Sequence, residues 1–79
     1  MAEEDHERVY EMRQSGEILA LEKILQISRQ RVRGKVIEVE LEQEDNRLVY
    51  ELEILDRDNR VWKVDIDALS GSILQVEED

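Results

Sequence analysis

The stretch that most constrains the fold is the run from Leu48 to Leu55, in which apolar and acidic side chains alternate. The apolar members of this run share one parity along the chain: Leu48, Tyr50, Leu52 and Ile54. Glu51 and Glu53 take the other parity. Because successive side chains of a strand point to opposite faces of a sheet, this period of two predicts a strand with one buried face. We therefore expect the run to lie in the middle of an antiparallel sheet that other elements cover on one face.

The segment before this run alternates in the same way. The inward side chains of residues 36–44 are expected to be Ile37, Val39 and Leu41, and the outward ones Glu38, Glu40, Glu42 and Glu44. The dipeptide Asp45-Asn46 then suits a tight turn, because Asp and Asn tolerate the left-handed backbone that such turns require. The two segments should therefore pair as a hairpin.

Two further strands are expected towards the C-terminus. Residues 61–67 follow a turn at residues 57–60 and place Trp62, Val64 and Ile66 on the core face. A last short strand, residues 73–76, follows a turn in which Gly71 supplies a positive φ.

Two helices are expected before the sheet. Residues 3–15 open with acidic side chains and end at Gly16, which favours a short helix. The second helix has an apolar stripe at helical spacing, made by Ile18, Leu21, Ile24, Leu25, Ser28 and Val32. Gly34 follows where a C-cap glycine belongs.

These elements predict an α+β fold. Two N-terminal helices precede an antiparallel meander of three to four strands, and the second helix packs on one face of the sheet. Residues 1–16 form an N-terminal helical segment and residues 17–79 hold the helix and the sheet, in one domain overall.

Charge and composition narrow the classes of partner. The chain has 21 acidic and 11 basic residues, a formal net charge of -10. A protein that binds nucleic acid needs a basic surface for the phosphates, so we expect no nucleic-acid partner. No stretch is long and apolar enough for membrane insertion, and the absence of cysteine excludes disulfides and thiolate metal sites.

The outward glutamates form the one cluster that could bind an ion. Neighbouring carboxylates can bind a hard cation, and the candidate ligands are Glu38, Glu40, Glu51, Glu53 and Asp65. A solvated sheet face without a pocket has the same pattern, and we consider it the simpler interpretation.

No catalytic set is expected. The segment from Asp56 to Arg60 begins like a calcium loop but lacks the later ligands and the turn glycine, so a turn is the better interpretation. His6 is the only histidine. We therefore expect neither an enzyme nor a cofactor.

The order of three segments resembles the PepSY domain family. The segments are Gly34 to Leu41, Val49 to Ile54, and Val64 to Leu74. The last of these is similar to the Asp-Ala-x-Thr-Gly ending of the family, with Ser70 in the threonine position. The resemblance covers about the latter two-thirds of the chain, and the preceding helix is similar to that of short stand-alone bacterial members.

The resemblance implies a non-enzymatic module that binds or regulates another protein in the bacterial cell envelope, as a peptidase inhibitor or a folding modulator. The partner would be a peptidase or an envelope protein, and the chain a monomer or a weak homodimer. The alternative is an acidic module that responds to divalent cations. The compartment is periplasmic or extracellular if the sequence is the mature form of an exported protein, and cytoplasmic if Met1 is the native start.

A free sheet edge is the expected place of contact with a partner, because an edge strand can pair with another chain. The last strand is the first candidate, since it is short and close to the C-terminus. The residues at this edge are Ser72, Ile73, Leu74, Gln75 and Val76.

Overall fold

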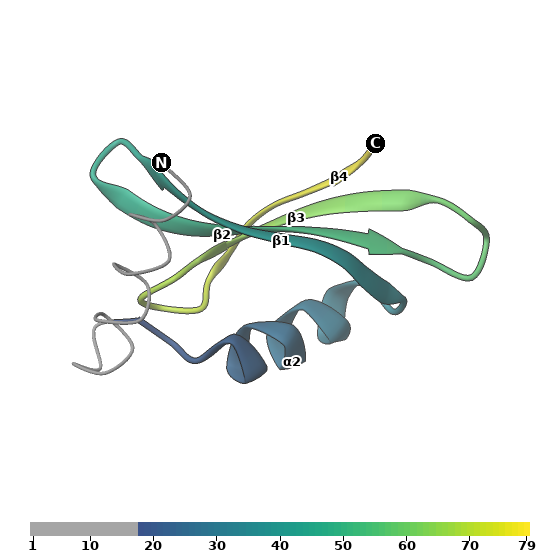
Figure 1. Cartoon of the computed structure of the whole chain (residues 1–79), viewed down its shortest axis with the longest axis horizontal. Coiled ribbons are helices and arrows are strands. Elements are labelled where there is room, and N and C mark those ends of the chain that lie inside the picture. Colours follow the sequence, from purple (N-terminus) through teal and green to yellow (C-terminus); the bar gives the residue numbers. More distant parts are fainter. Residues whose placement is uncertain (1–17) are drawn as a thin grey trace.

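One helix lies across one face of a four-stranded antiparallel sheet (Figure 1). This computed structural model describes residues 18–79. The helix is α2 (Leu21–Arg31), and the strands are β1 (Lys35–Glu44), β2 (Arg47–Leu55), β3 (Val61–Asp67) and β4 (Ile73–Glu78). The α+β class and the meander are confirmed, with four strands in the order β1-β2-β3-β4. The other helix predicted, over residues 3–15, lies outside the described residues, which contain one helix.

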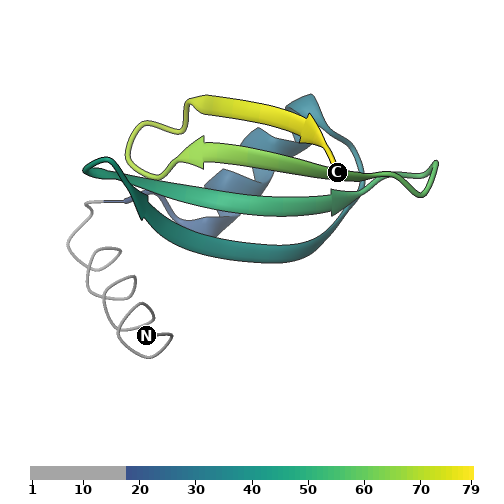
Figure 2. The ribbon, with the colours of Figure 1, turned by 90° about the horizontal axis from the view of Figure 1, so that it is seen from above.

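Helix α2 buries most of the stripe that its spacing predicts, and Ile18, also buried, lies before the helix. Ile24 and Ser28 are fully buried, and Leu21, Leu25 and Val32 pack against the core. The Ser28 hydroxyl donates to the Leu25 carbonyl at 2.8 Å, so the buried oxygen has a partner within the helix. The helix crosses the sheet diagonally, and its C-terminal end lies towards β4 (Figure 2).

The helix ends differently from the prediction. Val32 is the C-cap, in an extended conformation, and its N–H donates to the Ser28 carbonyl. Gly34 is therefore not a left-handed C-cap residue, and its φ is not among the positive values. A Cβ atom at this position would overlap the Leu55 carbonyl oxygen and approach Ile54 Cγ2 to 2.9 Å. Glycine is required here because the chain passes against the backbone of β2.

The β1–β2 hairpin has the two-residue turn that Asp45-Asn46 predicts. Their φ angles of 47° and 64° are both left-handed, as a type I′ turn requires. From this turn the register brings Leu41 opposite Tyr50 and Glu40 opposite Glu51.

A β-bulge corrects the predicted orientation of Ile37. The register passes from Val36 opposite Ile54 to Glu38 opposite Glu53, so Ile37 is an additional residue on β1. Val36 packs against the core in its place, and Ile37 is 49% exposed. The extra residue interrupts the strict alternation on which the prediction rested.

The core lies between α2 and the sheet. Its fully buried members include Ile24 on the helix, Leu52 and Ile54 on β2, and Val64 and Ile66 on β3. The predicted core side of the central run is thus confirmed for Tyr50, Leu52 and Ile54, and Leu48 packs against the same cluster.

Trp62 is less buried than predicted. It pairs with Ile54 in the β2–β3 register and so shares the core-facing parity, but it is only half-buried. Its indole Nε1 donates to Asp56 Oδ2 at 2.8 Å. The ring is held at the β2–β3 turn, which extends beyond the end of α2 in Figure 1.

Candidate functional site

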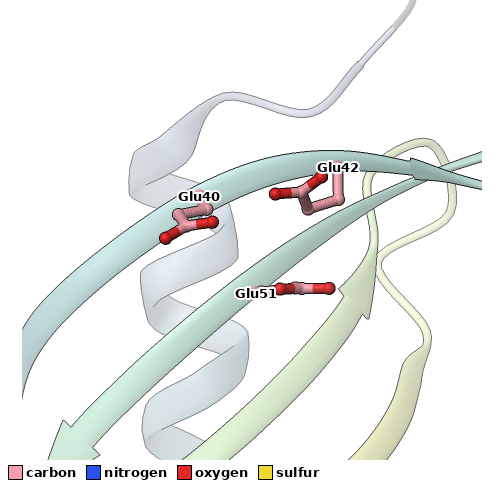
Figure 3. Close-up of side chains that lie close together, drawn as sticks. All are labelled: Glu40, Glu42 and Glu51. Atoms are coloured by element: carbon pink, nitrogen blue, oxygen red, sulfur yellow. The ribbon is translucent and has the colours of Figure 1, made fainter. Parts of the chain in front are cut away.

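The sheet face turned away from α2 carries the predicted row of carboxylates. Glu40 and Glu42 on β1 and Glu51 on β2 place carboxylate oxygens within 4.8 Å of one another (Figure 3). The antiparallel register causes this approach, because it sets Glu40 directly opposite Glu51. Asp65 on β3 lies opposite Glu51 on its other side, which extends the row across three strands.

A hollow of about 150 Å³, open to solvent, lies in this face. Its lining residues are Glu38, Glu40, Glu51, Leu52, Glu53, Lys63 and Asp65. All five predicted cation ligands therefore line one depression. The curvature between neighbouring twisted strands is a property of the sheet that side-chain parity does not encode.

Glu38 shows the electrostatic consequence of this crowding. Its hydrogen bonds with the carboxyls of Glu53 and Glu40, followed by the repulsion from their charges, raise its pKa from 4.5 to about 7. Glu38 is fully exposed, so the pKa reports on neighbouring carboxylates far more than on burial.

Glu51 has the same shift for a similar reason. The pKa of Glu51 is raised from 4.5 to about 7, and a hydrogen bond with Glu44 is the largest cause. Partial burial and the charges of Asp65, Glu44 and Glu42 raise it further. Burial also raises the pKa of Asp65, and the charges of Glu44 and Glu77 act in the same direction, whereas Lys63 opposes them. The face can therefore take up protons near neutral pH.

Two members of the cluster were not among the predicted ligands. Glu42 belongs to the converging carboxylates, and Glu44 is the hydrogen-bond partner of Glu51. Both share the strand parity of Glu38 and Glu40, and this parity was the sequence signal that could have added them to the predicted ligands. The diagonal approach of Glu44 to Glu51 depends on side-chain conformation, which the sequence does not give.

The segment that begins like a calcium loop is a turn, as expected. Asp56 Oδ1 accepts the backbone N–H groups of Asp58 and Arg60 at 2.8 and 2.9 Å, and Oδ2 accepts the Trp62 indole. These hydrogen bonds, the indole bond first, lower the pKa of Asp56. Both oxygens are already used within the protein.

The C-terminal motif, residues 67–71, also has structural roles. Asp67 Oδ1 accepts the N–H groups of Leu69 and Ser70, and the first cause of its lowered pKa is the bond from Ser70. Ala68 is fully buried, and its backbone joins β2 and the segment before α2 through bonds with Leu48 and Leu19.

Gly71 completes the motif for two reasons. Its φ of 80° favours glycine, and a Cβ atom would lie 2.8 Å from Ile27 Cδ1. The motif therefore specifies a close turn under the helix.

The sheet has two outer strands. Among residues 18–79, β1 pairs with β2 alone and β4 with β3 alone. The predicted edge residues Ile73 to Val76 lie on β4, and Ser72 directly precedes it. A second bulge places Leu74 as an extra residue in β4, between the pairs of Ile66 with Ile73 and Asp65 with Gln75.

The fold defines a small α+β module. The sheet face turned away from α2 carries carboxylates around a hollow, and β1 and β4 form the two edges of the sheet in the described residues. In the comparison with protein families, the chain matches PepSY, described as the peptidase propeptide and YPEB domain, over residues 18–77. The chain belongs to the PepSY family. No curated protein and no solved structure matches it.

PepSY domains are propeptide-like and inhibitor-like regulatory modules, generally non-catalytic, and the family suggests interaction with peptidases. They are typically extracellular or periplasmic. Within residues 18–79, no helix has the length and apolar character needed to cross a membrane. The chain's one histidine, His6, lies outside the described residues.

Proposed function

We propose that this chain is a non-enzymatic regulatory module that binds a peptidase or another envelope protein and either inhibits it or assists its folding. The observation that carries the proposal is the PepSY match, which extends over α2 and nearly the whole sheet. The motif residues Asp67 to Gly71 are consistent with it, because their hydrogen bonds and packing stabilise the fold. We therefore propose that the chain acts through surface contact with its partner.

A free sheet edge is the proposed means of contact, because an extended segment can add to it through backbone hydrogen bonds. Ser72 to Val76 remain candidates on the β4 side, and β1 provides the second edge. The proposed compartment is the bacterial cell envelope, in accordance with the usual location of the family.

Affinity capture tests the proposal. The immobilised full chain is mixed with an envelope fraction of the source bacterium, and each captured peptidase is purified and assayed with and without the free chain. We expect a saturable change in peptidase activity or in its yield on refolding. The same chain carrying Leu52→Ala, which damages the core, is the control. Recovery of no protein by the folded chain would contradict the proposal.

A second candidate function is a response to divalent cations. The convergence of Glu40, Glu42 and Glu51 within 4.8 Å favours it, since hard cations take several carboxylate oxygens. Calcium is titrated at physiological ionic strength while backbone amide shifts are recorded. Saturable shifts confined to this cluster, and lost in Glu40→Gln, would support it; an unchanged spectrum would dispose of it.

A further inference from the structure

We propose that the outer edge of β1 binds an extended segment of a different protein in which Lys or Arg alternates with aliphatic residues. The inference deepens the proposed function, on which it rests, by assigning the edge and the chemistry of the partner. It contrasts with the expectation from the sequence that β4 makes the contact.

The length of β1 is the first argument. Strand β1 has 10 residues and β4 has 6, and each contains one bulge, at Ile37 in β1 and at Leu74 in β4. Short edges with bulges are devices that discourage pairing with another chain. The part of β1 that follows Glu38 has an uninterrupted register up to the turn.

The direction of the backbone groups is the second argument. In a two-residue type I′ hairpin the pair that flanks the turn, here Glu44 and Arg47, is hydrogen-bonded, and hydrogen-bonded pairs alternate with non-bonded ones. Val39 and Leu41 fall at non-bonded positions. Their backbone N–H and C=O groups therefore point away from β2, towards an incoming strand.

The core side of β1 is suited to aliphatic side chains. Val39 shares the core-facing parity and is nevertheless 36% exposed, and Leu41 is half-buried. The C-terminal end of α2 lies towards β4, away from β1 (Figure 2). Aliphatic residues of an added strand would continue the core over Val39 and Leu41.

The other side of β1 is suited to basic side chains. Glu38 and Glu40 are exposed and project from the face turned away from the helix. Lysine or arginine directly opposite them would form favourable cross-strand pairs, and the second row of Glu51 and Glu53 adds to the negative potential. A second copy of the chain would instead set glutamate against glutamate, which is unfavourable.

Proton release gives an independent signature. Hydrogen bonds with neighbouring carboxyls raise the pKa of Glu38 to about 7, so Glu38 is partly protonated at neutral pH. A cation placed beside it would favour the ionised form. The proposed binding therefore releases protons and strengthens as the pH rises through 7.

Synthetic peptides of about eight residues, with alternating lysine and valine, provide the probe. Binding to the full chain is measured by calorimetry in buffers of different ionisation enthalpy. The bound peptide has two edges, and only one of them faces β1. N-methylation of the alternate residues whose N–H groups face β1 should weaken binding by about tenfold or more, whereas N-methylation along the other edge of the peptide should leave binding nearly unchanged. A peptide of the same composition in scrambled order should bind weakly.

Matched variants locate the edge. Val39→Pro removes one outward N–H while the ladder to β2 stays intact, because proline is tolerated where the N–H faces outward on an edge strand. Glu78→Pro is the counterpart on β4. Val39→Ala separates loss of the N–H from loss of the side chain, and Glu40→Gln is compared with Glu77→Gln on the same face of β4. Circular dichroism verifies that each variant is folded.

The proposal requires Val39→Pro and Glu40→Gln to weaken peptide binding by about tenfold, with Glu78→Pro and Glu77→Gln close to the unsubstituted chain. Wild-type affinity in Val39→Pro, or equal binding of the scrambled peptide, would overturn it. Loss of binding in Glu78→Pro alone would assign the contact to β4. In each of these cases the peptidase capture experiment still decides the proposed function separately.

Discussion

At the scale of single residues, four acidic side chains fall into two chemical classes. Asp56 and Asp67 each accept two backbone N–H groups through one carboxylate oxygen, and hydrogen bonds lower the pKa of both. Glu38 and Glu51 face other carboxyls instead, which raise their pKa values. The difference follows from position. Asp56 directly follows β2 and Asp67 is the last residue of β3, so both lie beside the backbone N–H groups of a turn, whereas the glutamates lie within paired strands.

Asp56→Ala is expected to lower the melting temperature. The substitution leaves the N–H groups of Asp58 and Arg60 and the Trp62 indole without their acceptor. Since Trp62 is the only tryptophan, its fluorescence reports the loss directly, and we expect a changed emission maximum in the folded protein. Asp58→Ala is the control, because Asp58 contributes its backbone N–H to this turn. Equal melting temperatures and emission for the two variants would contradict the assignment.

Gly34→Ala is expected to destabilise the protein by about 1–3 kcal/mol, the usual cost of overpacking. The added methyl group would meet the Leu55 backbone and Ile54 Cγ2, and backbone atoms cannot move aside as a side-chain end can. Urea denaturation measures the loss. Lys35→Ala, at the exposed neighbouring residue, should change the free energy of unfolding by less than about 0.5 kcal/mol. A Gly34→Ala variant as stable as this control would show that β2 can shift.

At the scale of elements, alternation was sufficient to predict a meander of three to four strands, because one buried face imposes a period of two on a regular strand. It failed at Ile37, where a bulge adds a residue without any change in composition. Alternation also overestimated the burial of the Trp62 side chain, because parity gives the face of a side chain and not whether the helix extends over it. The role of Gly34 depends on a contact with β2, far away in sequence.

The candidate site was predictable to a similar degree. Strand parity placed Glu38, Glu40, Glu51, Glu53 and Asp65 on one face, and the register brings them around one hollow. The hollow itself and the contribution of Glu44 depend on sheet twist and side-chain conformation, which a periodic pattern does not contain.

The acidic face predicts the pH dependence of stability. Glu38 and Glu51 have folded-state pKa values of about 7 against an ordinary 4.5, so between these values the folded chain binds more protons than the unfolded chain. Their stabilising effect is complete below 4.5 and is lost as the pH rises through 7. Asp56 and Asp67 act oppositely, because their lowered pKa values cost stability as the pH falls below 3.8.

We therefore expect a higher melting temperature at about pH 5 than at about pH 8. In the double variant Glu38→Gln with Glu51→Gln this difference should shrink, because amides do not titrate in this range. Scanning calorimetry at constant ionic strength makes the comparison. A double variant with the same difference as the unsubstituted chain would assign the effect to other groups.

At the scale of the whole molecule, the core is small and depends on few side chains. Leu52 is 1% exposed at the centre of the sheet, so Leu52→Ala is expected to cost about 2–5 kcal/mol. Chains of this size are marginally stable, and such a loss should leave a substantial unfolded population at room temperature. Leu69→Ala, at a side chain that is 56% exposed, is the matched control, and its free energy of unfolding should differ from that of the unsubstituted chain by less than about 0.5 kcal/mol. Equal denaturation midpoints for the two would contradict the core assignment.

The strand order β1-β2-β3-β4 also has a kinetic consequence, because every strand pairs with its immediate successor in the chain. Such pairing can begin beside each turn, where the loop to be closed is short, and extend from there along the two strands. The backbone bond from Leu19 to Ala68 is different, since it joins the segment before α2 to the far end of β3. Formation of the sheet as successive hairpins can therefore precede the docking of the helix, which closes a long loop and completes the core.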